Sequence, residues 1–342
     1  MSIPYRTQQN LKRLAGTLLI LAVVGVIVWG LWILWLQRFV VYTRDEGAVI
    51  NFELAQTLAA GEEAVPPSTE AEIEIHYNEG EDKVNLSTEL AQLKGYYVTS
   101  KSVTSDPAGI WEQIQTLPAG TPVMLDMKSI YGTFFYSTST GRPLSDSADI
   151  GAVDELIANL RSSGYYTIAR VPALRDREYG ISNTRSGLAT SGGYLWMDEE
   201  GCYWLNPAKE DTVTYLIDIA TELRELGFNE VVFDDYYFPD TKKIVFKEDK
   251  PQTLADTAQT LVTTCATDYF AVSFVSDGTW TAPVGRTRVY REDVTDPAQI
   301  LEVTQSLALT MTDPNIRLVF ITSNMDTRFE SYGVLRPINL AH

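Results

Sequence analysis

The chain has 342 residues, of which 45 are acidic and 27 are basic, so its formal net charge at pH 7 is −18. This balance argues against nucleic acid as a partner, because phosphate binding requires a basic surface. The only histidines are His76 and His342, which argues against a histidine-dependent triad or a multi-histidine zinc site, so we expect carboxylate chemistry without metal or cofactor.

The first predicted element is the uncharged apolar segment 14–36, which is long enough to cross a bilayer core of about 30 Å. Arg6, Lys12 and Arg13 precede it, no acidic residue does, and tryptophans near its far end are typical of an aromatic belt. We therefore expect a signal anchor in the cell membrane, with residues 1–13 in the cytoplasm and the C-terminal domain outside it. A cleaved signal peptide is the alternative, although the segment exceeds the usual hydrophobic region of about 7–15 residues.

Residues 37–93 are predicted to form an acidic stalk or linker. Between residues 62 and 82 there are seven glutamates and one aspartate, and no lysine or arginine. Such a segment repels itself and buries little apolar surface.

From residue 94 to residue 342, short β-type runs alternate with amphipathic helical patterns. The seven strand candidates are 95–100, 122–128, 165–171, 230–235, 269–275, 286–291 and 316–322. Helical patterns such as 149–164 and 209–227 lie between them and end in glycine. This alternation predicts a (β/α)8-type TIM barrel, irregular or incomplete in its C-terminal strands because an eighth strand is not evident. An open doubly wound sheet is the alternative, although its glycine-rich phosphate loops are absent.

Polar residues end several of the predicted strands, and in a β/α barrel the active site lies at that end. Asp126 and Lys128 end one strand, Arg170 lies on the next, and Asp234 and Asp235 end the following one. Asp126 and Lys128 are two residues apart, so both should point to the same face of their strand. If the strand phases agree, four side chains converge on one mouth: Asp126, Lys128, Arg170 and Asp234. Adjacent strand residues point to opposite faces, so only Asp234 of its pair is expected to face the mouth directly.

Such a set of residues favours glycosidic bond cleavage. Two carboxylates can act as general acid and as nucleophile or base, and their separation decides whether the product retains or inverts its configuration. We assign Asp234 and Asp126 as the catalytic pair, with Lys128 and Arg170 as charged neighbours. Each aspartate could instead be a loop organiser, and Arg170 could be only its ion-pair partner.

Other residues are candidates for substrate binding. Aromatic rings can stack on sugars, although aromatic residues are first of all core material. We place Tyr131, Trp204 and Tyr237 with Asp235, Lys128 and Arg170 as the substrate-binding set. The cysteines, Cys202 and Cys265, could form one disulfide outside the cell or remain as buried thiols.

Several segments, taken together, resemble a known family. "LKGYYVTS", "VMLDMKSIYG", "YYTIARVPALRDRE", "YWLNP" and "LGFNEVVFDDYYFP" follow the order and spacing of the putative glycosyl hydrolase family of TIM-barrel domains, mainly over residues 94–239. The resemblance implies acidic residues at the ends of the second and fourth barrel strands, which are Asp126 and Asp234 here.

The chain also departs from the family pattern. Ser129, Asn206 and Tyr237 stand where the family tends to carry two aspartates and an arginine, and later strands offer only Asp277 and Glu292 as acidic ends. We therefore expect a membrane-anchored glycoside hydrolase that acts on a cell-envelope or environmental glycan, and whether the site is catalytic stays open. The alternative is a catalytically degenerate, membrane-tethered carbohydrate-binding or scaffold domain.

Overall fold

The computed structural model describes residues 40–43, 47–50, 89–308 and 311–338. The predicted cytoplasmic tail, the transmembrane segment 14–36 and most of the acidic stalk lie outside these residues. Among the described helices, none combines the length and the apolar character that crossing a membrane requires. Near the N-terminus, β1 (Val40–Thr43) pairs antiparallel with β2 (Gly47–Ile50), with Val40 opposite Ile50.

The C-terminal domain contains a closed barrel of eight strands, and each strand is parallel to its neighbours. The strands are β3 (Lys94–Val98), β4 (Pro122–Asp126), β5 (Tyr166–Pro172), β6 (Glu230–Asp234), β7 (Ala271–Val275), β8 (Val289–Arg291), β9 (Leu318–Ile321) and β10 (Gly333–Pro337). β10 pairs with β3 and closes the barrel. The closed barrel confirms the (β/α)8-type prediction and rejects the open sheet.

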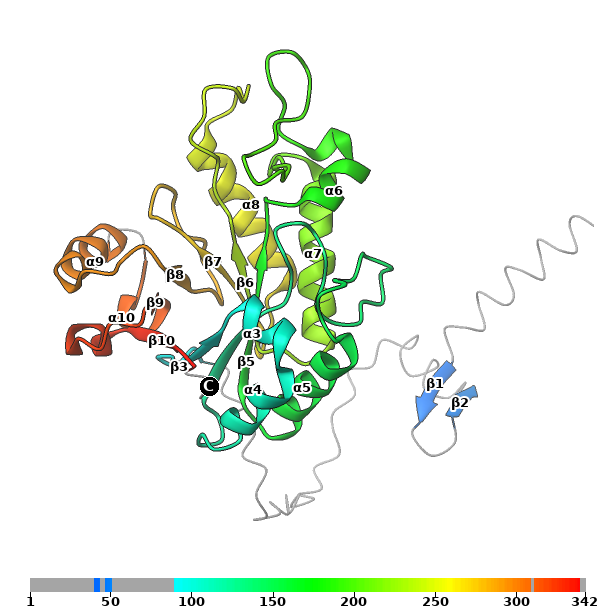
Figure 1. Ribbon diagram of the computed structural model, residues 1–342, viewed down its shortest axis with the longest axis vertical. Helices are drawn as coiled ribbons and strands as arrows, with labels where there is room; N and C mark the ends of the chain where they lie inside the picture. The colour runs from blue at the N-terminus through cyan, green and yellow to red at the C-terminus, as the bar shows by residue number, and fades with distance from the viewer. Residues whose placement is uncertain (1–39, 44–46, 51–88, 309–310, 339–342) are drawn as a thin grey trace, which may run out of the picture. The chain divides into compact units, whose positions relative to one another are not determined.

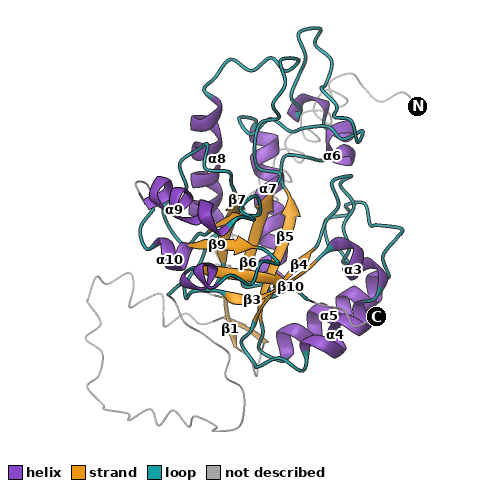
Figure 2. Ribbon diagram, turned by 60° about the vertical axis from the view of Figure 1, so that its left-hand side comes forward, coloured by secondary structure: helices purple, strands orange, loops and turns teal. Residues whose placement is uncertain are grey.

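Helices pack around the barrel strands, as Figures 1 and 2 show. They are α3 (Ser100–Ser105), α4 (Pro107–Ile114), α5 (Ile150–Ser162), α6 (Arg177–Ser182), α7 (Glu210–Glu225), α8 (Lys250–Cys265), α9 (Ile300–Ala308) and α10 (Pro314–Arg317), with 3-10 turns η2 (Thr184–Ser186), η3 (Pro297–Gln299) and η4 (Thr327–Ser331). α5, α7 and α8 contact β5, β6 and β7 respectively.

Local sequence explains where the long helices begin and end. The Asp149 carboxylate accepts a hydrogen bond from the Ala152 backbone N–H at the start of α5, and Asp249 does the same for Gln252 at the start of α8. Gly164 and Gly227 follow α5 and α7 with φ of +72° and +95°, a region that favours glycine.

The C-terminal strands are the irregular part of the barrel, as expected. β8 has three residues and β9 has four, and β9 is joined to β10 through η4 rather than through a full helix. The sequence analysis missed β10 because this five-residue strand begins with glycine and ends with proline, two residues that are depleted in strands.

The barrel interior shows which strand residues point inward. One buried cluster includes Met124 of β4, Ile168 of β5, Val232 of β6 and Tyr290 of β8. Since side chains alternate along a strand, the residues two positions further on also point inward, toward the C-terminal mouth.

At the opposite end of the barrel, a buried charge pair joins the strands. Glu230, the first residue of β6, forms an ion pair with Arg288, and both side chains are almost fully buried. The Tyr166 and Tyr290 hydroxyls each donate a hydrogen bond to Glu230, at 3.0 Å. This network connects β5, β6 and β8 and satisfies charges that water cannot reach.

Candidate active site

Strand alternation brings three of the predicted site residues to the barrel mouth. Asp126, Arg170 and Asp234 lie two residues beyond Met124, Ile168 and Val232, which point into the barrel. Asp126 pairs in register with Arg170, whereas Asp234 pairs with Pro172, two residues further along β5. The Arg170 backbone therefore lies one inward-facing position further into the barrel than that of Asp234, and its side chain extends toward the mouth to contact Asp234.

The Arg170 guanidinium is the centre of this cluster. Its Nε and Nη2 donate to Asp234 Oδ2 at 3.0 and 2.6 Å, and its Nη1 lies 3.7 Å from Asp126 Oδ1. The Asp235 backbone N–H donates to the other Asp234 oxygen at 2.7 Å. Asp234 thus accepts hydrogen bonds on both oxygens, which fixes the orientation of its carboxylate.

A fourth strand adds a further carboxylate to the cluster. Glu292 directly follows β8, two residues after the inward-pointing Tyr290, and its Oε1 lies 2.7 Å from Arg170 Nη2. Arg170 therefore contacts carboxylates that come from β4, β6 and β8. A guanidinium cannot lose its proton in this setting, and the acidic neighbours raise its pKa further against the effect of burial.

The shared guanidinium limits how far apart the carboxylates can lie. Asp234 Oδ2 and Glu292 Oε1 contact the same Nη2 atom at 2.6 and 2.7 Å, so they are at most about 5.3 Å apart. The Nη1 and Nη2 atoms are about 2.3 Å apart in a planar guanidinium, so Asp126 Oδ1 lies within about 9 Å of Asp234 Oδ2. Both separations are below the ~10 Å beyond which a two-carboxylate mechanism fails.

The environment raises the pKa of two of these carboxyls. Burial raises the pKa of Glu292 to about 7; Arg170 opposes the rise, and Asp234 is the first of the acidic groups that add to it. Burial also raises the pKa of Asp126, while Arg170 and the Ser100 backbone N–H, which donates to Asp126 Oδ2 at 2.7 Å, lower it.

Asp235 adopts an unusual backbone conformation just after β6. Its φ of +47° lies in the left-handed region, and this turn aims its backbone N–H at the Asp234 side chain. Burial, followed by the charge of Asp234, raises the pKa of Asp235 to about 6, and Arg175 opposes this rise. Asp235 therefore orients Asp234 through its backbone, and its predicted contact with substrate stays a prediction.

The structure corrects the position expected for Lys128. β4 ends at Asp126, so strand alternation does not continue to Lys128. The Lys128 side chain is buried, with its Nζ 2.7 Å from Asp176 Oδ2 and donating to the Pro172 carbonyl at 2.8 Å. Lys128 is therefore an internal ion-pair partner of Asp176, where it supports the loop after β5, rather than a side chain that a substrate reaches.

The predicted aromatic residues occupy different environments. Trp204 is buried, and its indole N–H donates to Asp198, which also forms an ion pair with Arg175 at 2.6 Å. The exposed Tyr237 ring packs edge-on against Trp204, with ring centroids 4.9 Å apart. Tyr237 therefore presents the accessible aromatic surface beside Asp235, and Trp204 supports it from below.

Tyr131 lies in the loop that follows β4. Its side chain is exposed, and its backbone carbonyl accepts a hydrogen bond from the Glu178 N–H at the start of α6. The structure thus leaves Tyr131 accessible to solvent, and a sugar contact there stays a prediction.

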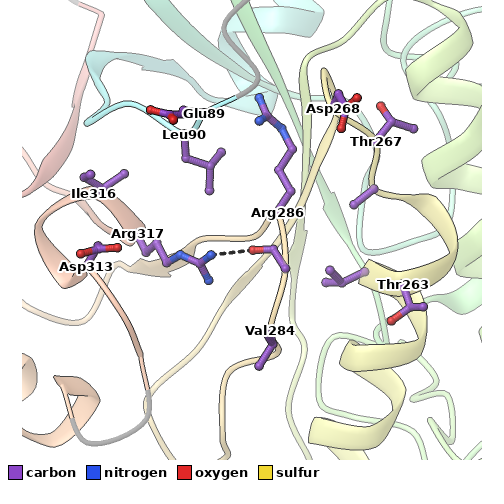
Figure 3. Close-up of a pocket in the computed structure, with 13 residues that line it drawn as sticks. Glu89, Leu90, Thr263, Thr267, Asp268, Val284, Arg286, Asp313, Ile316 and Arg317 are labelled. Atoms are coloured by element: carbon purple, nitrogen blue, oxygen red, sulfur yellow. Dashed lines mark hydrogen bonds between the residues drawn. The ribbon is translucent and has the colours of Figure 1, made fainter.

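A cavity of about 740 Å³ lies at the other end of the barrel (Figure 3). Its lining residues include Leu90, Asp268, Arg286 and Arg317, which precede strands β3, β7, β8 and β9 respectively. Arg317 donates to the Gly285 carbonyl at 2.8 Å. Since these residues precede their strands, the cavity lies at the N-terminal end of the barrel and is separate from the carboxylate mouth. Catalysis in β/α barrels occurs at the C-terminal end.

Two residues of the mouth had no assigned role in the sequence analysis. Glu292 was noted only as an acidic strand end, and Tyr97 of β3 was not singled out. Burial raises the pKa of Tyr97, and the charges of Glu292, Arg170 and Asp126 act on it, so its hydroxyl belongs to the same electrostatic cluster. The signal for Glu292 was its position immediately after a strand.

The two cysteines and the possible metal ligands form no further site among the described residues. Cys202 and Cys265 are both buried free thiols. Within the described residues, no group of three or more histidine, cysteine or acidic side chains is placed to hold a metal ion.

Comparison with known proteins identifies the family and the fold. The sequence profile described as "Putative glycosyl hydrolase domain" matches residues 95–271, which is half of the chain. No curated protein matches. An α-galactosidase from Lactobacillus brevis has a similar fold, with a TM-score of 0.51 and 10% identity over 73% of this chain and 38% of that one.

Two further structures are more distant. A hypothetical protein from Ruminiclostridium thermocellum has 21% identity and a TM-score of 0.45 over 52% of this chain and 96% of that one. An exo-β-N-acetylglucosaminidase from Vibrio harveyi has 8% identity and a TM-score of 0.49, over 72% of this chain and 50% of that one. The match thus spans no more than half of either named enzyme.

Proposed function

This chain belongs to the putative glycosyl hydrolase domain family, and we propose that it hydrolyses glycosidic bonds at the C-terminal mouth of its barrel. The substrate class is a glycan of the cell envelope or the surroundings. One observation carries the proposal: a single guanidinium, Arg170, contacts the strand-end carboxylates Asp126, Asp234 and Glu292. Glycosidases need two carboxylates held in different environments, and this cluster provides them.

Asp234 is the central catalytic residue of the proposal. Hydrogen bonds from Arg170 and from the Asp235 backbone N–H hold both of its carboxylate oxygens in place at the mouth. A carboxylate of this kind can stabilise or attack the positively charged carbon that develops as a glycosidic bond breaks. Arg170 is a positioning residue, because it acts through the carboxylates that it orients.

We also propose that residues 14–36 anchor the protein in the cell membrane, with the barrel on the extracytoplasmic side. The support is the uncharged length of this segment and the basic residues before it. An anchored barrel would meet glycans of the envelope or the surroundings rather than cytoplasmic sugars.

The test uses the full-length protein in detergent, as wild type and as Asp234→Asn. Both are incubated with peptidoglycan fragments and a panel of oligosaccharides, and the release of reducing ends is measured. The substitution keeps the size of the side chain and removes its charge. Asp277→Asn is the matched control, since Asp277 is an exposed acidic residue shortly after β7.

We expect release by the wild type and by Asp277→Asn, and loss of release in Asp234→Asn. Equal release by all three proteins would contradict a role for Asp234. Glycan binding without release in any of them would instead support the alternative, a membrane-tethered binding domain that has lost its chemistry.

A further inference from the structure

The mouth contains more than one possible partner for Asp234. Sequence reasoning selected Asp126, and the structure adds Glu292 on the other side of Asp234, at the end of β8. A proton donor must lie close to the nucleophile, reach the substrate and carry its proton at the working pH. These three requirements separate the two candidates.

Distance favours Glu292. Its Oε1 is at most about 5.3 Å from Asp234 Oδ2, since both contact Arg170 Nη2. Carboxyl groups of retaining glycosidases are about 5–5.5 Å apart, whereas inverting enzymes need about 6.5–9.5 Å to admit a water molecule. The upper bound for these two oxygens therefore lies within the retaining range and below the inverting one.

Access to the substrate also favours Glu292. Its side chain is 35% exposed, compared with 20% for Asp126. In addition, Asp126 Oδ2 accepts the Ser100 backbone N–H at 2.7 Å, and an oxygen that accepts this bond is poorly placed to carry a proton for transfer. Asp126 thus binds the start of α3 and contacts the guanidinium, while the Glu292 side chain keeps the larger exposed fraction.

We propose that Glu292 is the general acid and base of this barrel, that Asp234 is its nucleophile, and that the reaction retains the anomeric configuration. This inference rests on the proposed function. It assigns a catalytic role to a residue that the family match does not reach, because the match ends at residue 271.

The two steps balance in protons and bonds. First, an Asp234 oxygen bonds to the anomeric carbon, the glycosidic C–O bond breaks, and its electron pair stays on the leaving oxygen, which takes the Glu292 proton. Then the Glu292 carboxylate accepts a proton from water, the water oxygen bonds to the anomeric carbon, and the bond to Asp234 breaks. Asp234 leaves as a carboxylate and Glu292 is protonated again.

The charge environment agrees with this assignment. The groups that act on Glu292 are Arg170 from β5, Asp126 from β4, Asp234 and Asp235 from the end of β6, and Tyr97 from β3. On its own segment, Arg291 is paired with Asp293 through two hydrogen bonds of 2.8 Å. The resulting pKa of about 7 keeps much of Glu292 protonated near neutral pH, as a general acid requires.

The test compares two kinds of leaving group on panels of common α- and β-glycosides. The 2,4-dinitrophenolate of a dinitrophenyl glycoside leaves without protonation, whereas the methoxy group of a methyl glycoside must be protonated to leave as methanol. The full-length wild type, Glu292→Gln and Asp126→Asn are assayed on both. We expect Glu292→Gln to lose about 100- to 10,000-fold in kcat on methyl glycosides, with a much smaller effect on bond cleavage in dinitrophenyl glycosides.

Two further measurements make the result specific. The falling limb of the wild-type pH–rate profile, with a midpoint near the Glu292 pKa of about 7, should vanish in Glu292→Gln and persist in Asp126→Asn. Glu292→Ala with azide should form a glycosyl azide of retained configuration. If Glu292→Gln and Glu292→Ala fail to fold, Glu292→Asp provides a further test, because it keeps the carboxyl group. It should cleave both kinds of glycoside in the same ratio as the wild type, at a reduced rate.

The outcomes distinguish the two proposals. Inversion by the wild type, or loss of the falling limb in Asp126→Asn instead, would overturn the role of Glu292 and leave the proposed hydrolase intact. No cleavage of any glycoside or glycan by the wild type would overturn both.

Discussion

Arg170 shows how one side chain determines the chemistry of its neighbours. It contacts three carboxylates, and it opposes the rise that burial causes in the pKa of Glu292. Without its charge, the pKa values of Asp126 and Glu292 would rise further, because Arg170 lowers both. The guanidinium therefore limits the rise in the pKa of Glu292, which stays at about 7.

We predict that Arg170→Gln moves the falling limb of the pH–rate profile to higher pH and lowers kcat, because Asp234 loses two hydrogen bonds. The pH dependence of kcat is the measurement. Arg328→Gln is the control, since Arg328 is exposed and forms its ion pair with Asp326 rather than with a carboxylate of the cluster. An unchanged profile in Arg170→Gln would show that the guanidinium does not act on the catalytic groups.

The residue scale also shows what sequence reasoning could identify. Asp126, Arg170 and Asp234 interrupt apolar strands at positions where alternation makes them face inward, so their convergence could be predicted. Lys128 could not be placed, because its direction depends on β4 ending at Asp126. Glu292 could be recognised as an acidic strand end but not given a role, because it follows a three-residue strand and only the closed barrel brings it next to Arg170.

At the scale of elements, the barrel depends on contacts between strands that are distant in sequence. Glu230 on β6 and Arg288 at the start of β8 are buried together, and tyrosines from β5 and β8 complete their hydrogen bonds. Strand composition could predict seven strands but not this pairing, which needs the folded register. β10 was missed because its five residues have weak strand propensity on their own.

We predict that Glu230→Ala lowers the free energy of unfolding by about 3–5 kcal/mol, because it leaves the Arg288 charge buried without a partner. Urea denaturation measures this change. Glu225→Ala, at an exposed position on α7, is the matched control and should change the value by less than about 0.5 kcal/mol. Equal effects of the two substitutions would contradict the structural importance of the pair.

For the whole molecule, the raised pKa of Glu292 makes stability depend on pH. The folded protein binds the Glu292 proton more tightly than the unfolded chain does, where the glutamate pKa is 4.5. The contribution of this proton to the free energy of unfolding is therefore fully present below pH 4.5 and is lost as pH rises through about 7. We predict that this decline is weaker in Glu292→Gln, as measured by urea denaturation at several pH values. If the free energy of unfolding declined equally with pH in both proteins, Glu292 would not be the group responsible.

The proposed membrane anchor concerns the location of the whole molecule and can be tested by fractionation. We predict that the full-length protein remains with membranes after an alkaline wash, and that removal of residues 1–36 releases it, because the uncharged segment 14–36 is long enough to span a bilayer. Fractionation followed by immunoblotting measures this. Release of the full-length protein by the wash would contradict the anchor.

In the proposed reaction, Asp234 attacks the anomeric carbon of the sugar directly and forms a covalent intermediate. The most direct test of this attack is peptide mass spectrometry of full-length protein after incubation with 2,4-dinitrophenyl 2-deoxy-2-fluoroglycosides, which slow the release of a covalent intermediate. We expect the mass of one fluorosugar on the peptide that contains Asp234. The same label on Asp126 or Glu292, or hydrolysis without any covalent label, would contradict the assignment.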